Sequence, residues 1–130
     1  AIKIPEGNLM TIEPWDKSSV KDIERAILDS DLGVTPNSDG TVIRLPFPSL
    51  TEERRKELAK QCRTYAEEAR VAVRNARRDG NNAAQRAQKE EDLPEDQVNR
   101  AEKAIQKMTD EHIEKIDDLL KKKEADIMEV

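Results

Sequence analysis

The chain has 130 residues, enough for one compact domain or two small ones, and is 39% charged but only 2% aromatic. This composition excludes one thick globule and favours extended helices that bury narrow apolar stripes. No stretch approaches the roughly 20 apolar residues that cross a bilayer, so we expect no membrane partner. The chain opens at Ala1 directly in strand-like sequence, and we expect it to be part of a longer protein.

Charge and cysteine content narrow the class further. The formal net charge of −5 argues against a general nucleic-acid coat, yet residues 51–80 carry nine basic and six acidic side chains, a local net charge of +3. The single cysteine, Cys62, cannot form an internal disulfide and favours a reducing compartment. Cys62 is more typical of a small apolar core residue than of a nucleophile.

The sequence before residue 50 predicts strands separated by turns. We expect two short strands, at residues 2–4 and 9–12, on either side of a glycine-containing turn. Residues 36–40 have strong turn chemistry, and we expect residues 41–45 to form a further strand.

A short helix is predicted between these strands. Its apolar positions have helical spacing: Val20, Ile23 and Ile27. Ser18 or Ser19 can cap its start, and Gly33 supplies a left-handed residue to close it. We expect Trp15 to anchor this small unit.

A stiff connection separates this unit from the rest of the chain. Pro46 and Pro48 end the last strand, and together with Leu50 they form the predicted hinge. The sequence therefore predicts two domains, a small α+β domain at 1–49 and a helical domain at 50–130.

Two long helices are predicted in the second domain. Thr51 can cap the first helix, which ends before Pro94, and Gly80 allows a local bend in it. Its apolar stripe contains Leu58, Cys62, Tyr65, Ala69, Val73, Ala76, Ala83 and Ala87. The second helix starts at Pro94, with a stripe of Val98, Ala101, Ile105, Met108, His112, Ile116 and Leu119, and Ile127 near its end.

These stripes predict the fold class. The fold is α+β, with a long antiparallel helical hairpin, two helices of a three-helix bundle, beside a small β/α/β domain. Each stripe is wide enough to face more than one neighbour, so we expect a third long helix from a preceding segment or another chain.

The first long helix also carries a basic ridge. Its members recur at helical spacing: Arg63, Arg70, Arg74, Arg77 and Arg78. Guanidinium groups bind phosphates bidentately, so this ridge suits folded RNA, with Asn75 available for a sugar or base edge. The alternative is an ordinary solvated helix face paired with Glu67, Glu68 and Asp79, which charge alone favours.

Catalytic chemistry has no basis in the sequence. It contains no Cys/His pair with an orienting acid, no glycine-rich phosphate loop and no metal-ligand cluster, so we expect no enzyme, cofactor, metal site or small-molecule substrate. The only histidine, His112, is predicted to be a partly buried, hydrogen-bonded core residue.

Several motifs resemble one known family. Ser30 to Gly33, Leu50 to Lys56, Arg70 to Asp79 and the closing Glu124 to Val130 look like ribosome recycling factor. The likeness spans essentially the whole chain, and the ten-residue arginine motif is its most specific part.

This resemblance implies a function in translation termination. The family binds the post-termination ribosome through large-subunit rRNA and, with elongation factor G, promotes subunit dissociation. The resemblance assigns rRNA binding to Arg55, Arg70, Arg74, Asn75, Arg77 and Arg78. It also implies a bacterial cytoplasmic location, or an organellar stroma or matrix, and about 55 further residues before Ala1, an estimate that includes the first bundle helix.

Two alternatives remain. A coiled-coil module without an RNA role would dock its hairpin onto helices of a protein partner and leave the arginines solvated. An enzyme fragment would need perturbed titratable groups in a cleft, which the sequence does not offer.

Gly80 and Pro94 depart from the family pattern, but neither belongs to the arginine motif.

Overall fold

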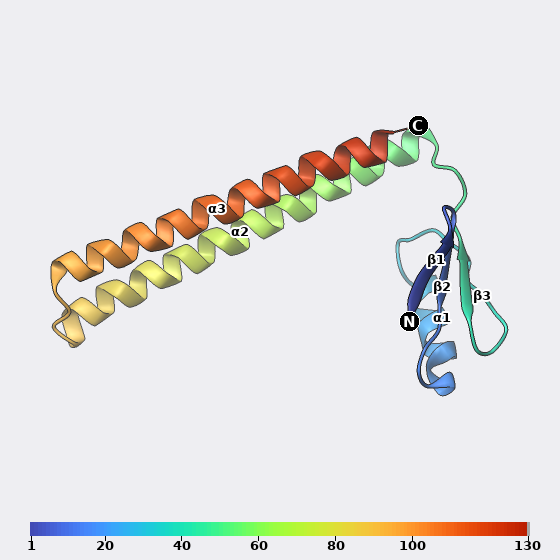
Figure 1. The fold of residues 1–130 in the computed structure, drawn as a ribbon, viewed down its shortest axis with the longest axis horizontal. Helices are drawn as coiled ribbons and strands as arrows, with labels where there is room; N and C mark the ends of the chain where they lie inside the picture. The colour runs from blue at the N-terminus through green and yellow to red at the C-terminus, as the bar shows by residue number, and fades with distance from the viewer. Residues whose placement is uncertain (130) are drawn as a thin grey trace. The chain divides into compact units, whose positions relative to one another are not determined.

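The computed structural model describes residues 1–129, which divide into two compact units at the bond between Leu50 and Thr51 (Figure 1). The first unit contains four strands and the short helix α1. The second consists of two long helices, α2 (Glu52–Glu90) and α3 (Glu95–Met128). This element order confirms the α+β class, with a helical hairpin and a small sheet.

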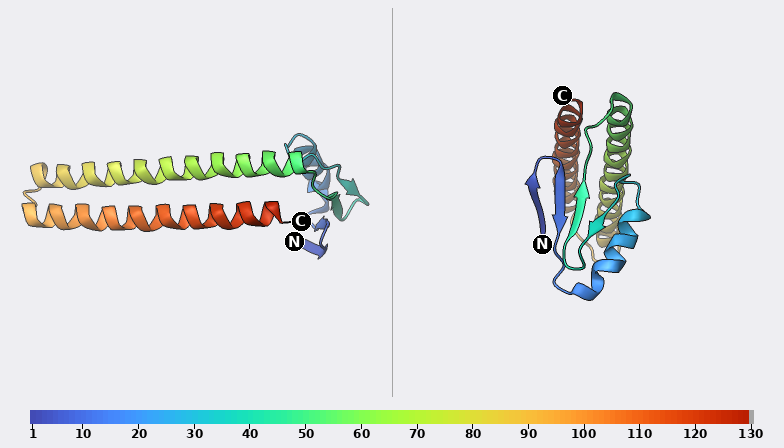
Figure 2. Two further views of the ribbon diagram at one scale, coloured as in Figure 1. Left: turned by 90° about the horizontal axis from the view of Figure 1, so that it is seen from above. Right: turned by 90° about the vertical axis from the view of Figure 1, so that its right-hand side faces the viewer.

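The first unit is built on one antiparallel sheet in the order β1-β2-β4-β3 (Figure 2, right). Its strands are β1 (Ile2–Glu6), β2 (Leu9–Ile12), β3 (Asn37–Ser38) and β4 (Ile43–Pro46). In the central pair, Ile12 lies opposite Ile43 and Leu9 lies opposite Pro46. Pro46 is therefore the last paired residue of β4 and not a residue beyond it.

Helix α1 (Val20–Leu28), preceded by a 3-10 turn at Lys17–Ser19, supplies the other half of this unit's core. The buried residues are Val20, Ile27, Val34, Ile43 and Leu45. Ile43 and Leu45 alternate with exposed residues along β4, as expected for a sheet covered on one face. The predicted helix with its spaced apolar residues is thus confirmed.

Three details of this unit differ from the prediction. The Asp16 carboxylate, and neither Ser18 nor Ser19, caps the turn before α1, accepting a hydrogen bond from the Ser18 N–H at 2.9 Å. Gly33 has φ +65° but lies beyond the end of α1 at Leu28. The indole of Trp15 is fully exposed, so Trp15 does not anchor the core.

The strand predicted at 41–45 begins later, at Ile43. The Asp39 carboxylate accepts hydrogen bonds from the N–H groups of Thr41 at 3.0 Å and Val42 at 2.9 Å, and this turn delays the strand. Strand β3 was not predicted, because two residues are too short to show an alternating pattern.

The second unit is an antiparallel hairpin whose helices lie side by side along their length (Figure 2, left). Thr51 caps α2 as predicted, since its side chain accepts a hydrogen bond from the Arg54 N–H at 3.1 Å. The helix runs unbroken through Gly80. A Cβ added at Gly80 would lie 3.1 Å from Ile105 Cδ1, so this glycine permits close contact with α3.

The seam between the helices is narrower than the predicted stripes. Its buried residues are Ala59, Ala66, Val98, Thr109 and Ile127. Tyr65, Met108 and Leu119 are 57%, 52% and 67% exposed, so they are not core residues in this structure. His112 is likewise exposed, and the prediction of a core histidine is wrong; its Nδ1 lies 2.7 Å from the Met108 carbonyl oxygen.

Apolar grooves follow one flank of this seam. One is lined by Val73, Ala76, Arg77, Gly80, Ile105, Met108, Thr109 and His112. Another is lined by Cys62, Tyr65, Ala66, Ala69, Ile116, Leu119, Leu120 and Lys123. A third helix over this flank stays a prediction.

No helix within residues 1–129 is both long enough and apolar enough to cross a membrane.

Candidate nucleic-acid interface

The arginines of α2 form one face of the helix. Arg63, Arg70, Arg74 and Arg78 recur at steps of seven and four, which return to the same side of an α-helix. Arg77 lies beside them and closer to α3, since its Nη1 donates to Gln106 of that helix. It also lines the apolar groove on the other flank of the seam. We call the set Arg63, Arg70, Arg74, Arg77 and Arg78 the arginine face.

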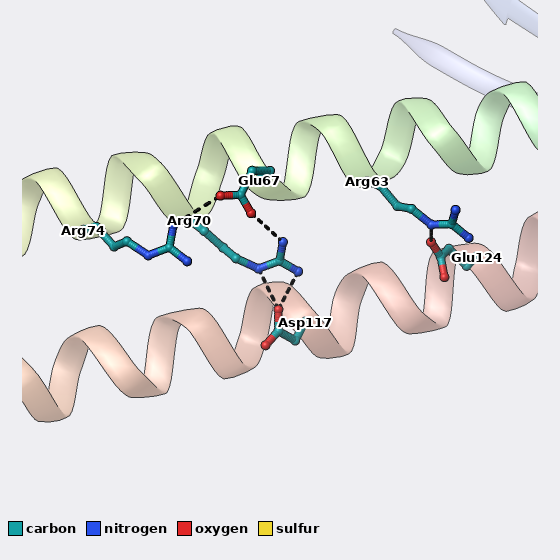
Figure 3. A network of polar contacts seen from close by, with 6 residues as sticks. All are labelled: Arg63, Glu67, Arg70, Arg74, Asp117 and Glu124. Carbon is teal, nitrogen blue, oxygen red and sulfur yellow. Dashed lines mark hydrogen bonds and ion pairs between the residues drawn. The ribbon is translucent and has the colours of Figure 1, made fainter.

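Arg70 is the most firmly held member of the arginine face. Its Nη2 lies 2.6 Å from Asp117 Oδ1 on α3, and its Nε donates to the same oxygen at 2.8 Å (Figure 3). Its Nη1 donates to Glu67 Oε2 at 3.1 Å. Asp117 and then Glu67 raise the pKa of Arg70, whose side chain is only 20% exposed. Arg70 therefore joins α2 to α3.

Arg74 is held more loosely. Its Nη1 donates to Glu67 Oε1 at 3.2 Å, and its side chain is 46% exposed. Glu67 thus accepts from two arginines, and these bonds, first from Arg70 and then from Arg74, lower the pKa of Glu67. The guanidinium of Arg74 is accessible to an external anion.

The remaining members have different partners. Arg63 Nε donates to Glu124 Oε1 on α3 at 2.6 Å, a second link between the helices (Figure 3). Arg77 Nη1 donates to Gln106 Oε1 at 3.5 Å. Arg78 Nε lies 4.0 Å from Asp79 Oδ1, and its side chain is 67% exposed. Asn75 is exposed on the adjoining surface.

Arg55 lies in the first turn of α2 and has a different structural role. Its Nη1 donates to the Ile127 carbonyl at 2.7 Å and to the Glu129 carbonyl as well. These carbonyls belong to the end of α3, whose last turn has no basic residue of its own. Arg55 therefore supplies the positive charge that suits a helix C-terminus.

The structure thus brings most of the six predicted site residues together and separates one. Arg70, Arg74, Asn75, Arg77 and Arg78 share the middle of α2, whereas Arg55 lies at its start. Part of the paired-face alternative is present, because Glu67 and Asp79 contact arginines. Glu68 makes no hydrogen bond or ion pair with the described residues.

Sequence reasoning missed the acidic partners on α3. Asp117 lies 47 positions from Arg70, and Glu124 lies 61 positions from Arg63. Spacing within one helix cannot find such partners; only the antiparallel register of the hairpin could have done so.

The arginine face can still bind anions. Ion pairs between exposed side chains contribute little to stability, so exchange of a carboxylate for a phosphate at Arg74 or Arg78 is inexpensive. No group of three or more His, Cys, Asp or Glu side chains in the described part of the chain is placed to hold a metal ion.

Comparison with known proteins identifies the family. The family model described as ribosome recycling factor matches residues 1–128. The chain is 52% identical over its full length to ribosome-recycling factors of Bacillus velezensis and Bacillus subtilis, and it covers 70% of each of those proteins.

Solved structures agree with this assignment. A solution structure of the ribosome recycling factor matches with a TM-score of 0.66 at 42% identity, over all of this chain and 68% of that one. The second is one of the models for the T. thermophilus ribosome recycling factor and the E. coli elongation factor G bound to the E. coli post-termination complex. It matches with a TM-score of 0.58 at 45% identity, over 99% of this chain and 70% of that one.

A small sheet unit followed by a long helical hairpin is the fold of a family of non-enzymatic translation factors that bind the ribosome. The chain belongs to the ribosome recycling factor family.

Proposed function

We propose that this chain binds the post-termination ribosome by placing its arginine face on large-subunit rRNA, and that with elongation factor G it promotes dissociation of the subunits. We place this ribosome binding and subunit dissociation in the cytoplasm of a bacterium. The single observation that carries the RNA contact is the exposed arginine pair Arg74 and Arg78, one helical turn apart on α2.

Charge repulsion supports this proposal. Arg74 and Arg78 are four residues apart, a spacing at which like charges destabilise a helix. A surface that serves only stability gains nothing from this pair, whereas a phosphate placed between two guanidinium groups turns the repulsion into attraction.

The predicted contacts now separate by role. Arg74, Arg77 and Arg78 are the direct rRNA contacts that we propose, and Asn75 adds a hydrogen-bonding group beside them. Arg55 and Arg70 already bind carbonyls and carboxylates of α3, so we assign them the positioning of the hairpin.

Elongation factor G is the proposed protein partner. The support is one matched structure, in which a ribosome recycling factor and elongation factor G are placed on the same post-termination complex. Nucleotide hydrolysis is assigned to that partner, and this chain acts by binding. Pro46, Pro48 and Leu50 stay the proposed hinge between the two units.

A second candidate function rests on the apolar grooves. Tyr65, Met108 and Leu119 are exposed along one flank of the hairpin, and an amphipathic helix of a protein partner could cover them. Such docking buries apolar surface and depends little on salt, which separates it from binding to phosphates.

Cosedimentation with purified large ribosomal subunits at low and at physiological salt tests the proposal. We expect salt-sensitive binding, with affinity lower by at least about tenfold at the higher salt if several phosphates are contacted. Arg74→Ala and Arg77→Ala should weaken binding and leave helicity intact.

The matched control is Lys115→Ala. It removes one positive charge from α3 two residues from Asp117, about 200° around that helix and so away from the arginine face. Equal affinity for the parent, Arg74→Ala and Arg77→Ala would contradict the RNA contact. Salt-independent binding would favour the docking of a protein helix.

A further inference from the structure

Glu67 is an acidic residue in the middle of the arginine face. It lies three, seven and eleven positions before Arg70, Arg74 and Arg78, spacings that all return to the same side of α2. A carboxylate at this position repels the phosphates that the arginine face would bind, so its presence there needs an explanation.

Both oxygens of Glu67 are engaged by arginines. Oε2 accepts from Arg70 Nη1 at 3.1 Å and Oε1 accepts from Arg74 Nη1 at 3.2 Å (Figure 3). Seven residues, or about 10 Å along the helix axis, separate Glu67 from Arg74, which extends back along α2 to make this bond. Its side chain therefore lies along the helix surface instead of projecting away from it.

The two arginines would respond differently to the loss of Glu67. Arg70 keeps its two contacts with Asp117 Oδ1, at 2.6 and 2.8 Å, and so stays in place. Arg74 has Glu67 as its only hydrogen-bonding partner among the described residues, and loss of the carboxylate frees it. Glu67 thus acts mainly on Arg74.

We propose that Glu67 is an affinity-limiting residue, which competes with an RNA phosphate for the guanidinium of Arg74. Binding of the phosphodiester backbone requires Arg74 to leave Glu67, and release of the RNA is assisted when Glu67 takes Arg74 back. This inference rests on the proposed rRNA contact and adds that the arginine face carries its own competing anion, which assists release of the RNA.

The test uses Glu67→Gln in the full chain and measures affinity for purified large subunits at low salt. Loss of the carboxylate should tighten binding by about two- to fivefold, the range expected for one exposed ion pair. Glu67→Ala, which lacks the amide as well, should tighten binding to a similar extent. Circular dichroism should show unchanged helicity, since Arg70 still links the helices.

The control is Glu68→Gln, which removes the same charge one position further along, about 100° around the helix. Glu68 has no arginine partner within the described residues, so we expect at most a small change in affinity. The second control repeats Glu67→Gln in an Arg74→Ala background, where the gain in affinity should vanish.

The outcomes separate this inference from the proposed function. An equal gain in Glu68→Gln, or a gain that persists without Arg74, would show that Glu67 acts through net charge alone and would overturn the inference. No gain in Glu67→Gln would overturn it too. If Arg74→Ala by itself leaves affinity unchanged, the rRNA contact proposed for that residue fails as well.

Discussion

At the scale of single residues, the arginines of α2 differ more in their partners than in their chemistry. Arg70 and Arg55 bind groups on α3, whereas within residues 1–129 Arg78 has a single, distant contact, 4.0 Å from its neighbour Asp79. An arginine with well-placed intramolecular partners is costly to remove, and one exposed to solvent is free to exchange partners. The same residue type is therefore held by intramolecular partners at one position and is available to an external partner at another.

The clearest pH effect at this scale belongs to Asp39. Its carboxylate accepts from the Val42 N–H, the Thr41 N–H and the Thr41 hydroxyl, with Arg44 beside it, and these contacts hold the pKa of Asp39 well below its usual range. The folded state therefore stabilises the ionised carboxylate of Asp39 more than the unfolded state does. Asp39 therefore stabilises the sheet unit above its unfolded pKa of about 3.9, and this contribution is lost as pH falls below that value.

Asp39→Asn should remove this dependence. The variant should be less stable than the parent at neutral pH, and the difference should shrink as pH falls below about 4. Hydrogen exchange of the Ile43 and Leu45 amides, compared between parent and variant at each pH, provides the measurement. Glu6→Gln, at an exposed position of β1, is the control. A difference that does not vary with pH would contradict the assignment.

At the scale of elements, the hairpin was predictable and the depth of its seam was not. Apolar residues at steps of three and four indicated two long helices, and Thr51 marked the start of the first. Tyr65 was predicted to lie in the apolar stripe that faces the partner helix. The buried residue is instead the next one, Ala66, because a small side chain allows the helices to approach closely. Burial in a two-helix seam depends on which residue fits, and periodicity alone does not give that.

The base of the hairpin depends on a contact that sequence spacing could not reveal. Arg55 reaches the last carbonyls of α3, 72 positions away. Arg55→Ala should lower the free energy of unfolding by about 1 kcal/mol, because a charge-assisted hydrogen bond and a favourable helix-terminus charge are lost. Chemical denaturation followed by circular dichroism measures this, and hydrogen exchange should show increased fraying after Ile127.

Lys60→Ala is the matched variant for this test, since it removes an exposed cation from the same helix. We expect its stability to equal that of the parent. If Arg55→Ala retains full stability but loses ribosome binding, Arg55 is a direct rRNA contact and the positioning role is wrong.

At the scale of the whole molecule, the hairpin has two differently built flanks. The arginine face lies on one flank of the seam, where Arg63 and Arg70 meet carboxylates of α3. The apolar grooves lie on the other, lined by residues that the sequence had assigned to a wider core. The two surfaces meet at Arg77, which belongs to the arginine face and also lines one of the grooves. The two candidate functions therefore occupy largely different surfaces.

The resemblance carried by Arg70 to Asp79 gave the family, and the fold agrees with it. The roles of individual arginines needed the structure, because they depend on Glu67, Asp117 and the end of α3. Sequence identity places these side chains in a family, whereas their partners decide which of them can release a carboxylate for a phosphate.

Directed cleavage of rRNA tests the central claim most directly. Cys62→Ser would remove the only native thiol, and Asn75→Cys or Lys115→Cys would then carry tethered Fe-EDTA beside the arginine face or on the far side of α3. With large subunits, we predict strong local cleavage of the large-subunit rRNA from position 75 and weak cleavage from position 115. Stronger cleavage from position 115, or none from position 75 while the chain is bound, would contradict an rRNA-binding arginine face.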